Sequence, residues 1–404
     1  MRILIVSQYY YPEQFLINEI APELVRRGND VTVISGVPNY PKGEVYKGYE
    51  KGKRKHDLIN GVSVIRCRNL PRGHNKVCLL LNYLSFMIVA YNETKRLNSQ
   101  FDIVYIYQLT PITQAYPAIR YAKKRGIKVF CYCLDLAPAS GEDVIKKIGF
   151  LMHIYRKFAQ WAYSNCDLIA VTSKDFMNYL HSIHGIQEKK IVYLPQHAPE
   201  IVYTEGLMRK QENTVAILFA GNVGFGARLD HLLFVAKRLL DEHFCFRIKI
   251  VGDGSDKQRL ITLAKNLNLG GSVVFFDQIP LSEMGPVFAD ADVLFVSLRK
   301  GQLTVPGKVQ AYMAIGKPII GSMDGSGKEL INEAKCGKCA DAEDEEGLYR
   351  IIKEYLENPA LFSSCGKNGK EYYRKNFKLC SHVDKLVDLL NQLIKSNCDQ
   401  EYIQ

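Results

Sequence analysis

Short apolar runs alternate with segments of helical periodicity from the first residues onward. Ile3–Ser7 and Asp30–Ser35 have the pattern of buried strands, and Gln14–Arg27 between them has the spacing of an amphipathic helix. Strands separated by helices usually pair in parallel, because each helix carries the chain back to the same end of the sheet. The first half is therefore predicted to be a doubly wound α/β domain, with further strands at Ser63–Arg66, Asp102–Tyr107, Lys128–Leu134, Leu168–Thr172 and Ile191–Leu194.

The same alternation begins again in the second half, after the proline-containing segment YLPQHAPEIVYTEG. We predict two Rossmann-like domains, 1–199 and 200–381, that face each other across a cleft and bind one substrate each at the carboxyl ends of their strands. A final helix at about 382–396 is expected to pack back on the first domain. The strands expected in the second domain are Val215–Ala220, Phe246–Val251, Val273–Phe276, Val293–Val296 and Pro318–Gly321.

Charge is distributed unevenly between the two halves. The 404-residue chain has a net charge of +11, and residues 1–200 hold 27 Lys/Arg against 16 Asp/Glu, whereas the remainder is balanced. The densest basic segment, Lys51–Lys76, contains a single acid, Asp57. Such a segment attracts a nucleic acid, an anionic membrane or a pyrophosphate-bearing substrate, or is simply a solvated face. No nucleic-acid-binding motif accompanies it, so nucleic acid is not an expected partner.

An apolar stretch, Val77–Tyr91, directly follows the basic segment. It is shorter than the roughly 20 residues needed to span a bilayer. A basic segment beside an apolar helix predicts peripheral docking on the inner face of the cytoplasmic membrane. An ordinary core helix is the alternative. The N-terminal sequence MRILIVSQYYYPE lacks the features of a signal peptide, which favours a cytoplasmic location.

No metal site is expected from the cysteines. They are scattered and odd in number, which disfavours a disulfide framework. Cys336 and Cys339 have C-x-x-C spacing, but no second pair matches it. Buried thiols are the favoured interpretation.

The segment Leu303–Gly321 carries the strongest candidate site. Pro306-Gly307 suits the start of a helix, and Lys308 then lies in the first turn. A cation there opposes the helix dipole, unless an anion such as a diphosphate binds between them. A lysine extended into solvent is the alternative. Thr304 and Gln310 in the same segment are further candidate donor-binding residues.

A glycine-rich turn follows the strand Val215–Ala220. Gly221, Gly224 and Gly226 have the spacing G-x-x-G-x-G, which differs from the dinucleotide fingerprint, and no acidic residue ends the next strand. A bound NAD is therefore not expected. The turn either brings the backbone close to a phosphate or is a tight turn without a ligand.

Three further segments follow predicted strands and are candidates for substrate contacts. VGDG, with Gly252 and Asp253, and FFDQIP, with Gln278, are expected to line a base pocket. Asp135 in LDLAPASG follows a first-domain strand. Its carboxylate is predicted either to bind sugar hydroxyls or to cap a helix.

In order and in sequence these segments resemble glycosyltransferase family 4. The resemblance is carried by YYYPEQFLINEIAPELVRRGNDVTVISGVPNYPKG, LDLAPASG, AGNVGFG, VGDG, VPGKVQAYMAIGKPIIG and GSGKELINEAKCG. It looks closest to the branch that builds colanic acid, capsule and O-antigen, which includes fucosamine transferases. The resemblance implies a GT-B fold and metal-independent, retaining transfer without a cofactor. It also implies that a nucleotide-diphosphate sugar is held mainly by the second domain.

The resemblance assigns roles to four residues. It implies that Lys308 binds the diphosphate and that Gly221 and Gly307 allow close backbone approach. Asp135 matches the acidic position in the substrate loop of the first domain. Lys308 and Asp135 are therefore the predicted catalytic residues.

The chain departs from the family pattern at several positions. Leu303 and Ala311 stand where many members have a pair of glutamates. Asn222 and Ala227 stand where an arginine and a lysine are common. Arg228 is expected to supply the lost charge and Gln310 the ribose contact. Asn222 stays a candidate donor-binding residue. The N-terminal glycine pair of many members is Gln14-Phe15 here.

The predicted activity is transfer of a sugar, with retention, from a nucleotide donor that we expect to be a UDP-sugar. An N-acetylated amino sugar such as L-FucNAc and an undecaprenyl-diphosphate-linked saccharide acceptor are the partners that the resemblance implies. A sugar-nucleotide 2-epimerase of the same fold and a non-catalytic membrane scaffold are the alternatives. The sparse acid/base candidates argue against the epimerase, and the absent glutamates make the scaffold conceivable.

Overall fold

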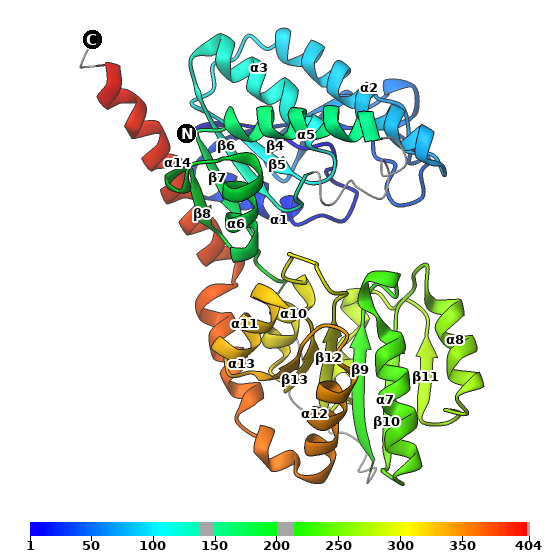
Figure 1. The fold of residues 1–404 in the computed structure, drawn as a ribbon. Helices are drawn as coiled ribbons and strands as arrows, with labels where there is room; N and C mark the ends of the chain where they lie inside the picture. The colour runs from blue at the N-terminus through cyan, green and yellow to red at the C-terminus, as the bar shows by residue number, and fades with distance from the viewer. Residues whose placement is uncertain (138–148, 200–213, 402–404) are drawn as a thin grey trace. The chain divides into compact units, whose positions relative to one another are not determined.

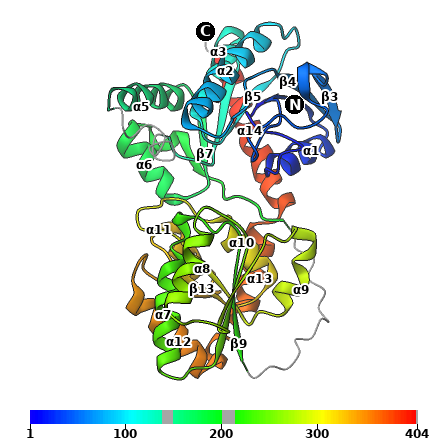
Figure 2. The same ribbon diagram turned by 90° about the vertical axis from the view of Figure 1, so that its right-hand side faces the viewer.

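The computed structural model describes residues 1–137, 149–199 and 214–401 (Figures 1 and 2). The chain divides into two compact units. Unit 1 comprises Met1–Pro195 together with Leu379–Gln404, and unit 2 comprises Gln196–Lys378. Each unit is a doubly wound α/β domain of the expected class.

Unit 1 is built on an eight-stranded sheet in the order β3-β4-β2-β1-β5-β6-β7-β8. All neighbouring strands are parallel except β3, which pairs antiparallel with β4 at the edge. The sequence pattern did not predict β3, because its half-exposed residues lack an apolar run. The strands are β1 (Arg2–Val6), β2 (Asp30–Gly36), β3 (His56–Ile59), β4 (Val62–Cys67), β5 (Ile103–Gln108), β6 (Lys128–Cys133), β7 (Leu168–Val171) and β8 (Ile191–Tyr193).

Helices cover this sheet, and the last helix of the chain returns to it. Side chains of α1 and α14 share one core with β1, β2 and β5. Helix α1 begins at Ile17 and not at Gln14, because residues 11–16 form a turn in which the Asn18 side chain donates to the Glu13 carbonyl. The helices are α1 (Ile17–Arg26), α2 (Lys76–Lys95), α3 (Ala115–Arg125), α5 (Gly149–Ser164), α6 (Lys174–His184) and α14 (Leu379–Glu401).

Unit 2 contains a six-stranded parallel sheet in the order β11-β10-β9-β12-β13-β14. Three strands have the predicted bounds, whereas β14 was not predicted because it is short and half polar. The strands are β9 (Val215–Ala220), β10 (Phe246–Val251), β11 (Val273–Phe276), β12 (Val293–Ser297), β13 (Ile319–Ser322) and β14 (Gly337–Ala340). The helices are α7 (Leu229–Asp241), α8 (Lys257–Asn266), α9 (Gly285–Ala289), α10 (Gly307–Ile315), α11 (Gly325–Glu333), α12 (Glu345–Glu357) and α13 (Cys365–Asn376).

Short 3-10 helices complete the described chain: η1 (Glu50–Gly52), η2 (Ile112–Gln114), η4 (Glu188–Lys190), η5 (Phe225–Ala227), η6 (Leu281–Glu283) and η7 (Pro359–Phe362).

Each sheet has a point at which the winding direction reverses. In unit 2 the chain moves outward from β9 to β10 and β11, then returns to the other side of β9 and continues through β12, β13 and β14. In unit 1 the corresponding reversal lies between β1 and β5. Loops that leave such a pair of strands diverge and leave a crevice at the carboxyl ends, where doubly wound proteins bind ligands. We therefore expect ligand-binding residues in the loops after β1, β5, β9 and β12.

Candidate functional site

Glycines bring two loops into direct backbone contact at the carboxyl edge of unit 2. The Gly221 amide, just after β9, donates to the Val251 carbonyl at 2.9 Å, and the Val223 amide donates to the Asp253 carbonyl at the same distance. A Cβ at Gly252 would lie 1.9 Å from the Gly221 carbonyl oxygen. Gly221 and Gly252 also have positive φ angles, +137° and +144°, which side chains disfavour. The close approach therefore requires glycine at both positions.

Lys308 lies across this glycine turn from the first turn of α10. A Cβ at Gly221 would be 2.4 Å from the Lys308 Cε, so the lysine side chain occupies the space that a side chain would fill. Its Nζ is 4.1 Å from the centroid of the Phe219 ring. Within the described ranges no carboxylate or carbonyl contacts this ammonium. Burial lowers the pKa of Lys308 to about 8.

The start of α10 adds to the positive potential around Lys308. Pro306 is the N-cap, and no side chain caps the free amides of the first turn. The helix dipole opposes the Lys308 charge, and desolvation opposes it as well. An anion placed between the amides and Nζ would relieve both penalties. The arrangement therefore has the chemistry of an anion-binding site.

The Tyr312 side chain connects α10 to the end of β9. The sequence pattern did not identify this residue as part of the site. Its hydroxyl accepts from the Ala220 amide at 2.9 Å and donates to the Ala220 carbonyl at 3.2 Å. The ring is fully buried against Phe288. Tyr312 follows Lys308 by one helical turn, so the same helix supplies the cation and the link that positions Gly221 beside it. A tyrosine within an apolar helix segment was the available signal.

The other predicted donor-binding residues occupy the same edge with different exposure. Asn222 is exposed and lies over Gly254, and the exposed Asp253 accepts from the Gly254 amide at 2.8 Å. Gln278 is exposed beyond β11. The structure gives these three side chains no contact with Lys308.

Three residues in or beside α10 differ in how open they are. Gly307 is exposed, and the only atom near a Cβ built on it is Gln196 Oε1 at 3.9 Å. Thr304 is half-buried before the helix. Gln310 is almost fully buried, and its Oε1 has no hydrogen-bond donor among the described residues.

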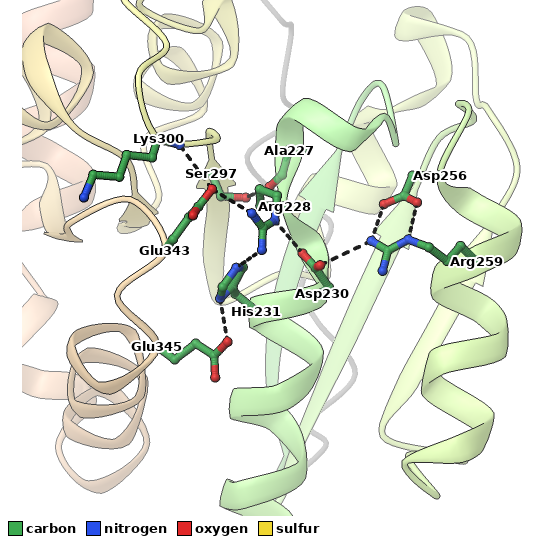
Figure 3. A network of polar contacts seen from close by, with 10 residues as sticks. All are labelled: Ala227, Arg228, Asp230, His231, Asp256, Arg259, Ser297, Lys300, Glu343 and Glu345. Atoms are coloured by element: carbon green, nitrogen blue, oxygen red, sulfur yellow. Dashed lines mark hydrogen bonds and ion pairs between the residues drawn. The ribbon is translucent and has the colours of Figure 1, made fainter.

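Arg228 belongs to an ion-pair network within unit 2 (Figure 3). Its Nε donates to Asp230 at 3.1 Å, its Nη1 donates to Glu343 at 2.7 Å, and its Nη2 contacts the His231 ring. That Arg228 supplies charge to a bound diphosphate stays a prediction; its guanidinium is already paired with Asp230 and Glu343. Through its ion pairs with Asp230 and Glu343, the guanidinium holds the start of α7 to the loop before α12.

In unit 1, Asp135 anchors the loop that follows β5. Its Oδ2 accepts from the Thr110 amide at 3.0 Å and from the Thr110 hydroxyl at 3.2 Å. Its backbone carbonyl accepts from Gln108 Nε2 at 2.6 Å. Burial raises the pKa of the Asp135 carboxyl, and the two Thr110 bonds partly oppose that rise. The remainder of LDLAPASG, from Pro138 onward, lies outside the described residues.

An aromatic and basic cluster lies at the carboxyl edge of unit 1. The Tyr9 and Phe15 rings stack at 5.1 Å, and Tyr40 packs against both. The Arg72 guanidinium lies 5.3 Å from the Tyr40 ring centroid and donates to the Tyr9 hydroxyl at 3.3 Å. Tyr9 itself is buried, so the Phe15 and Tyr40 rings beside the Arg72 guanidinium form the part of the cluster suited to sugar faces and anionic groups. The sequence pattern points to these segments and to Phe15, but it does not indicate that Tyr9, Tyr40 and Arg72 join it.

The Glu13 carboxylate connects the loops that carry this cluster. Its Oε1 accepts from the Asn39 amide at 2.8 Å and the Tyr40 amide at 2.7 Å, which joins the loops after β1 and β2. Burial raises the pKa of Glu13 to about 7. The turn segments YYYPE and PNYPKG therefore meet in space.

Among the described residues no group of three or more His, Cys, Asp or Glu side chains is placed to hold a metal ion. Cys336 is buried and Cys339 half-buried, and the ten described cysteines are free. Burial raises the pKa of both thiols in the C-x-x-C pair to about 12, so neither is an activated thiolate. Metal independence stays a prediction.

Curated relatives and solved structures resemble the chain over most of its length. The putative colanic acid biosynthesis glycosyl transferase of Escherichia coli is 24% identical over 78% of this chain and 82% of its own. Sucrose-phosphate synthase from Thermosynechococcus elongatus superimposes with a TM-score of 0.73 at 15% identity, covering 98% and 99% of the two chains. The Anabaena protein HepE, solved in complex with UDP-glucose, has a TM-score of 0.68 at 12% identity, with 97% and 100% covered.

Two family models match successive parts of the chain. The model described as Glycosyltransferase Family 4 matches residues 15–196, and the model described as Glycosyl transferases group 1 matches residues 208–372. The two matches follow the two structural units in order. The sheet topologies and the solved neighbours have the GT-B architecture. The chain belongs to glycosyltransferase family 4 and is a GT-B glycosyltransferase.

Proposed function

We propose that this protein transfers a sugar, with retention of anomeric configuration, from a UDP-sugar to a lipid-linked saccharide in bacterial surface-polysaccharide synthesis. Unit 2 binds the donor and unit 1 binds the acceptor. An N-acetylated amino sugar such as L-FucNAc is the transferred group to test first, because the sequence resembles the branch that contains fucosamine transferases.

The observation that carries the proposal is the unpaired Lys308 ammonium beside Gly221. It lies where the winding of the unit 2 sheet reverses, at an uncapped helix start. A diphosphate offers the two negative charges and several acceptor oxygens that this site lacks. The Anabaena HepE structure is in complex with UDP-glucose, which supports a UDP-sugar as the donor class.

Lys308 and the α10 amides also supply the chemistry that sugar transfer requires. Breaking the bond to the anomeric carbon leaves negative charge on the departing diphosphate. A preorganised cation and helix amides stabilise that charge without reorganisation, so the reaction needs no metal ion. The acceptor oxygen forms its bond to the anomeric carbon on the face from which the diphosphate departs, which gives retention, and its proton passes to the leaving phosphate oxygen. No protein nucleophile takes part in this scheme.

The acceptor side of the proposal rests on unit 1. The Phe15 and Tyr40 rings, which pack against the buried Tyr9, and the Arg72 guanidinium offer stacking and charge to a saccharide linked to a diphosphate. We propose undecaprenyl diphosphate as the carrier and the inner face of the cytoplasmic membrane as the place of work. Relatives named for colanic acid and lipopolysaccharide core biosynthesis support this class of product.

The test is a reaction with a panel of UDP-sugars, including UDP-L-FucNAc, and undecaprenyl-diphosphate saccharides. We expect acceptor-dependent release of UDP in the presence of EDTA and a product one sugar heavier by mass spectrometry. NMR of that product should show the donor's anomeric configuration. An epimer formed from donor alone would indicate an epimerase, and donor binding without release under any condition would indicate a scaffold. Loss of activity in EDTA with recovery in Mn²⁺ would contradict the scheme.

A further inference from the structure

One side of α2 is apolar and exposed from Val77 to Ile88. Val77, Leu80, Leu81, Leu84 and Ile88 recur at helical spacing and are between 38% and 67% exposed. Tyr91 and Lys95 continue the same line to the end of the helix. At 1.5 Å per residue the exposed apolar part of this line, from Val77 to Ile88, extends over about 17 Å. Exposed apolar rows of this length mark an interaction surface.

The opposite side of α2 is built into unit 1, so this helix does not cross a membrane. By length and composition alone it could span one. However, Asn82 on the buried side accepts from Gln8 Nε2 at 2.7 Å and donates to the Leu70 carbonyl at 2.6 Å. Tyr83, Phe86 and Ala90 are buried beside it. The helix is therefore anchored in the protein core and offers only its outer stripe.

A basic groove adjoins the far end of this stripe. The groove lies between α2 and α3, which run side by side (Figure 1), and has a volume of about 380 Å³. Lys95 Nζ lies 4.1 Å from the Tyr91 ring, and the Tyr121 hydroxyl donates to the Ser99 carbonyl. The groove lining has no carboxylate; it includes two aromatic rings and four cations, namely Tyr91, Tyr121, Lys95, Arg120, Lys123 and Lys124.

Three cations of α3 have no counter-charge among the residues that the structure describes. Arg120, Lys123 and Lys124 are exposed and make no ion pair in the described part of the chain. The basic segment singled out from the sequence is different, because Arg54 pairs with Asp57 at 3.3 Å and Lys55 pairs with Glu93 at 3.1 Å. Glu93 is also the one acid among α2, α3 and α5, which carry eight Lys and Arg residues.

We propose that the α2 stripe and the α2–α3 groove, together the α2–α3 face, dock unit 1 on an anionic lipid bilayer. The helix lies in the plane of the interface with its stripe against the acyl chains, and lipid phosphates enter the groove. An apolar row beside unpaired cations matches the apolar interior and anionic surface of such a bilayer. The proposal rests on the membrane location proposed above, and it places the contact on α3 in preference to residues 53–55.

The test measures vesicle binding by flotation at low and high salt. Vesicles of phosphatidylcholine with about one-third phosphatidylglycerol are compared with pure phosphatidylcholine. Wild type is expected to bind only the anionic vesicles and to dissociate in high salt. Neutralising the three α3 cations together, as R120Q/K123Q/K124Q, should weaken binding about a hundredfold. The apolar stripe is tested separately by L84S/I88S, which should also lose binding.

Two matched controls accompany these variants. Neutralising three exposed unit 2 lysines, as K265Q/K367Q/K375Q, makes the same change in net charge and should leave vesicle binding within about threefold of wild type. K53Q/R54Q/K55Q should weaken binding less than the α3 variant does. UDP affinity is measured for every variant and is expected to be unchanged, because unit 2 holds the donor.

Three results would overturn the proposal. These are absence of wild-type binding to anionic vesicles, unchanged binding of the α3 variant, and a loss no greater than that of the unit 2 control. Concentration-dependent dimers that the stripe variant abolishes, with vesicle binding unaffected, would assign the stripe to a second copy of the chain. Normal vesicle binding without any sugar transfer would count against the transferase reaction and leave the docking surface standing.

Discussion

Replacing Lys308 by methionine is expected to weaken UDP binding while making unit 2 more stable. In the free protein, burial lowers the pKa of Lys308 from 10.5 to about 8. At about 1.4 kcal/mol per pKa unit, this difference amounts to roughly 3 kcal/mol that the buried charge costs the folded state. Because the side chain keeps some solvent contact, we expect methionine to add about 1 to 3 kcal/mol at pH 7.

The pH dependence gives the sign of this effect. The unfolded lysine holds its proton up to pH 10.5, whereas the folded one loses it near pH 8. Wild-type stability therefore rises with pH between these values, and the advantage of Lys308→Met shrinks over the same range. Thermal unfolding at pH 7 and pH 10 measures it. For a unit of this size, 1 kcal/mol corresponds to about 2–4 °C in Tm.

The UDP affinity of Lys308→Met should fall, although its stability should rise. Loss of a charged hydrogen bond to phosphate is worth about 1.5–3 kcal/mol, so UDP affinity by calorimetry should fall about tenfold to a hundredfold. Lys317→Met is the matched control, because Lys317 Nζ donates to the Ala289 carbonyl at 2.8 Å and to the Ala291 carbonyl. That variant should lose stability and keep UDP affinity. If Lys308→Met also lowers Tm and leaves UDP binding intact, the lysine is structural and the reasoning fails.

Three further predictions concern the same edge of unit 2. Gly221→Ala introduces a Cβ 2.4 Å from Lys308 Cε and should reduce UDP affinity at least about tenfold, whereas Gly226→Ala, with open space around it, should not; equal affinities would contradict the packing. Tyr312→Phe removes the hydroxyl that pairs with the half-buried Ala220 amide and should cost about 1–3 kcal/mol in urea unfolding, while Tyr372→Phe at an exposed hydroxyl should cost less than about 0.5 kcal/mol. UDP affinity should be constant below pH 8 and fall up to about tenfold per pH unit above it, because diphosphate binds the protonated Lys308; calorimetry from pH 7 to 9.5 that shows no such fall refutes this role.

The sheets were predictable because their signal is local. Val215–Ala220 and Val273–Phe276 are apolar runs, and Phe246–Val251 alternates apolar with basic residues. Glycine or aspartate follows each segment, and each is a strand with those bounds. Strands β3 and β14 escaped prediction because their sequences, HDLI and GKCA, contain no apolar run, and each owes its place to pairing with a neighbouring strand. Tertiary pairing, and not local propensity, forms such edges.

In the candidate site, too, local features were predictable from the sequence and long-range contacts were not. The position of Lys308 follows from the helix start after Pro306, which one stretch of sequence contains. The ion pair between Arg228 and Glu343 cannot be predicted in this way, because Glu343 lies 115 residues further along the chain. The Glu13 link to the loop after β2 likewise depends on how two separate turns fold against each other. Long-range ion pairs and side-chain bonds to distant backbone amides leave no periodic trace in the sequence.

Helix α14 imposes an order on synthesis and folding. Val383, Leu386 and Leu390 fill the same core as β1 and α1, although nearly the whole chain separates them in sequence. The ribosome makes all of unit 2 before it makes these residues, so unit 1 stays incomplete while unit 2 can already fold. During that interval an apolar groove on the first unit is open to chaperones and to other nascent chains. Premature termination anywhere after unit 2 would therefore damage the domain that was made first.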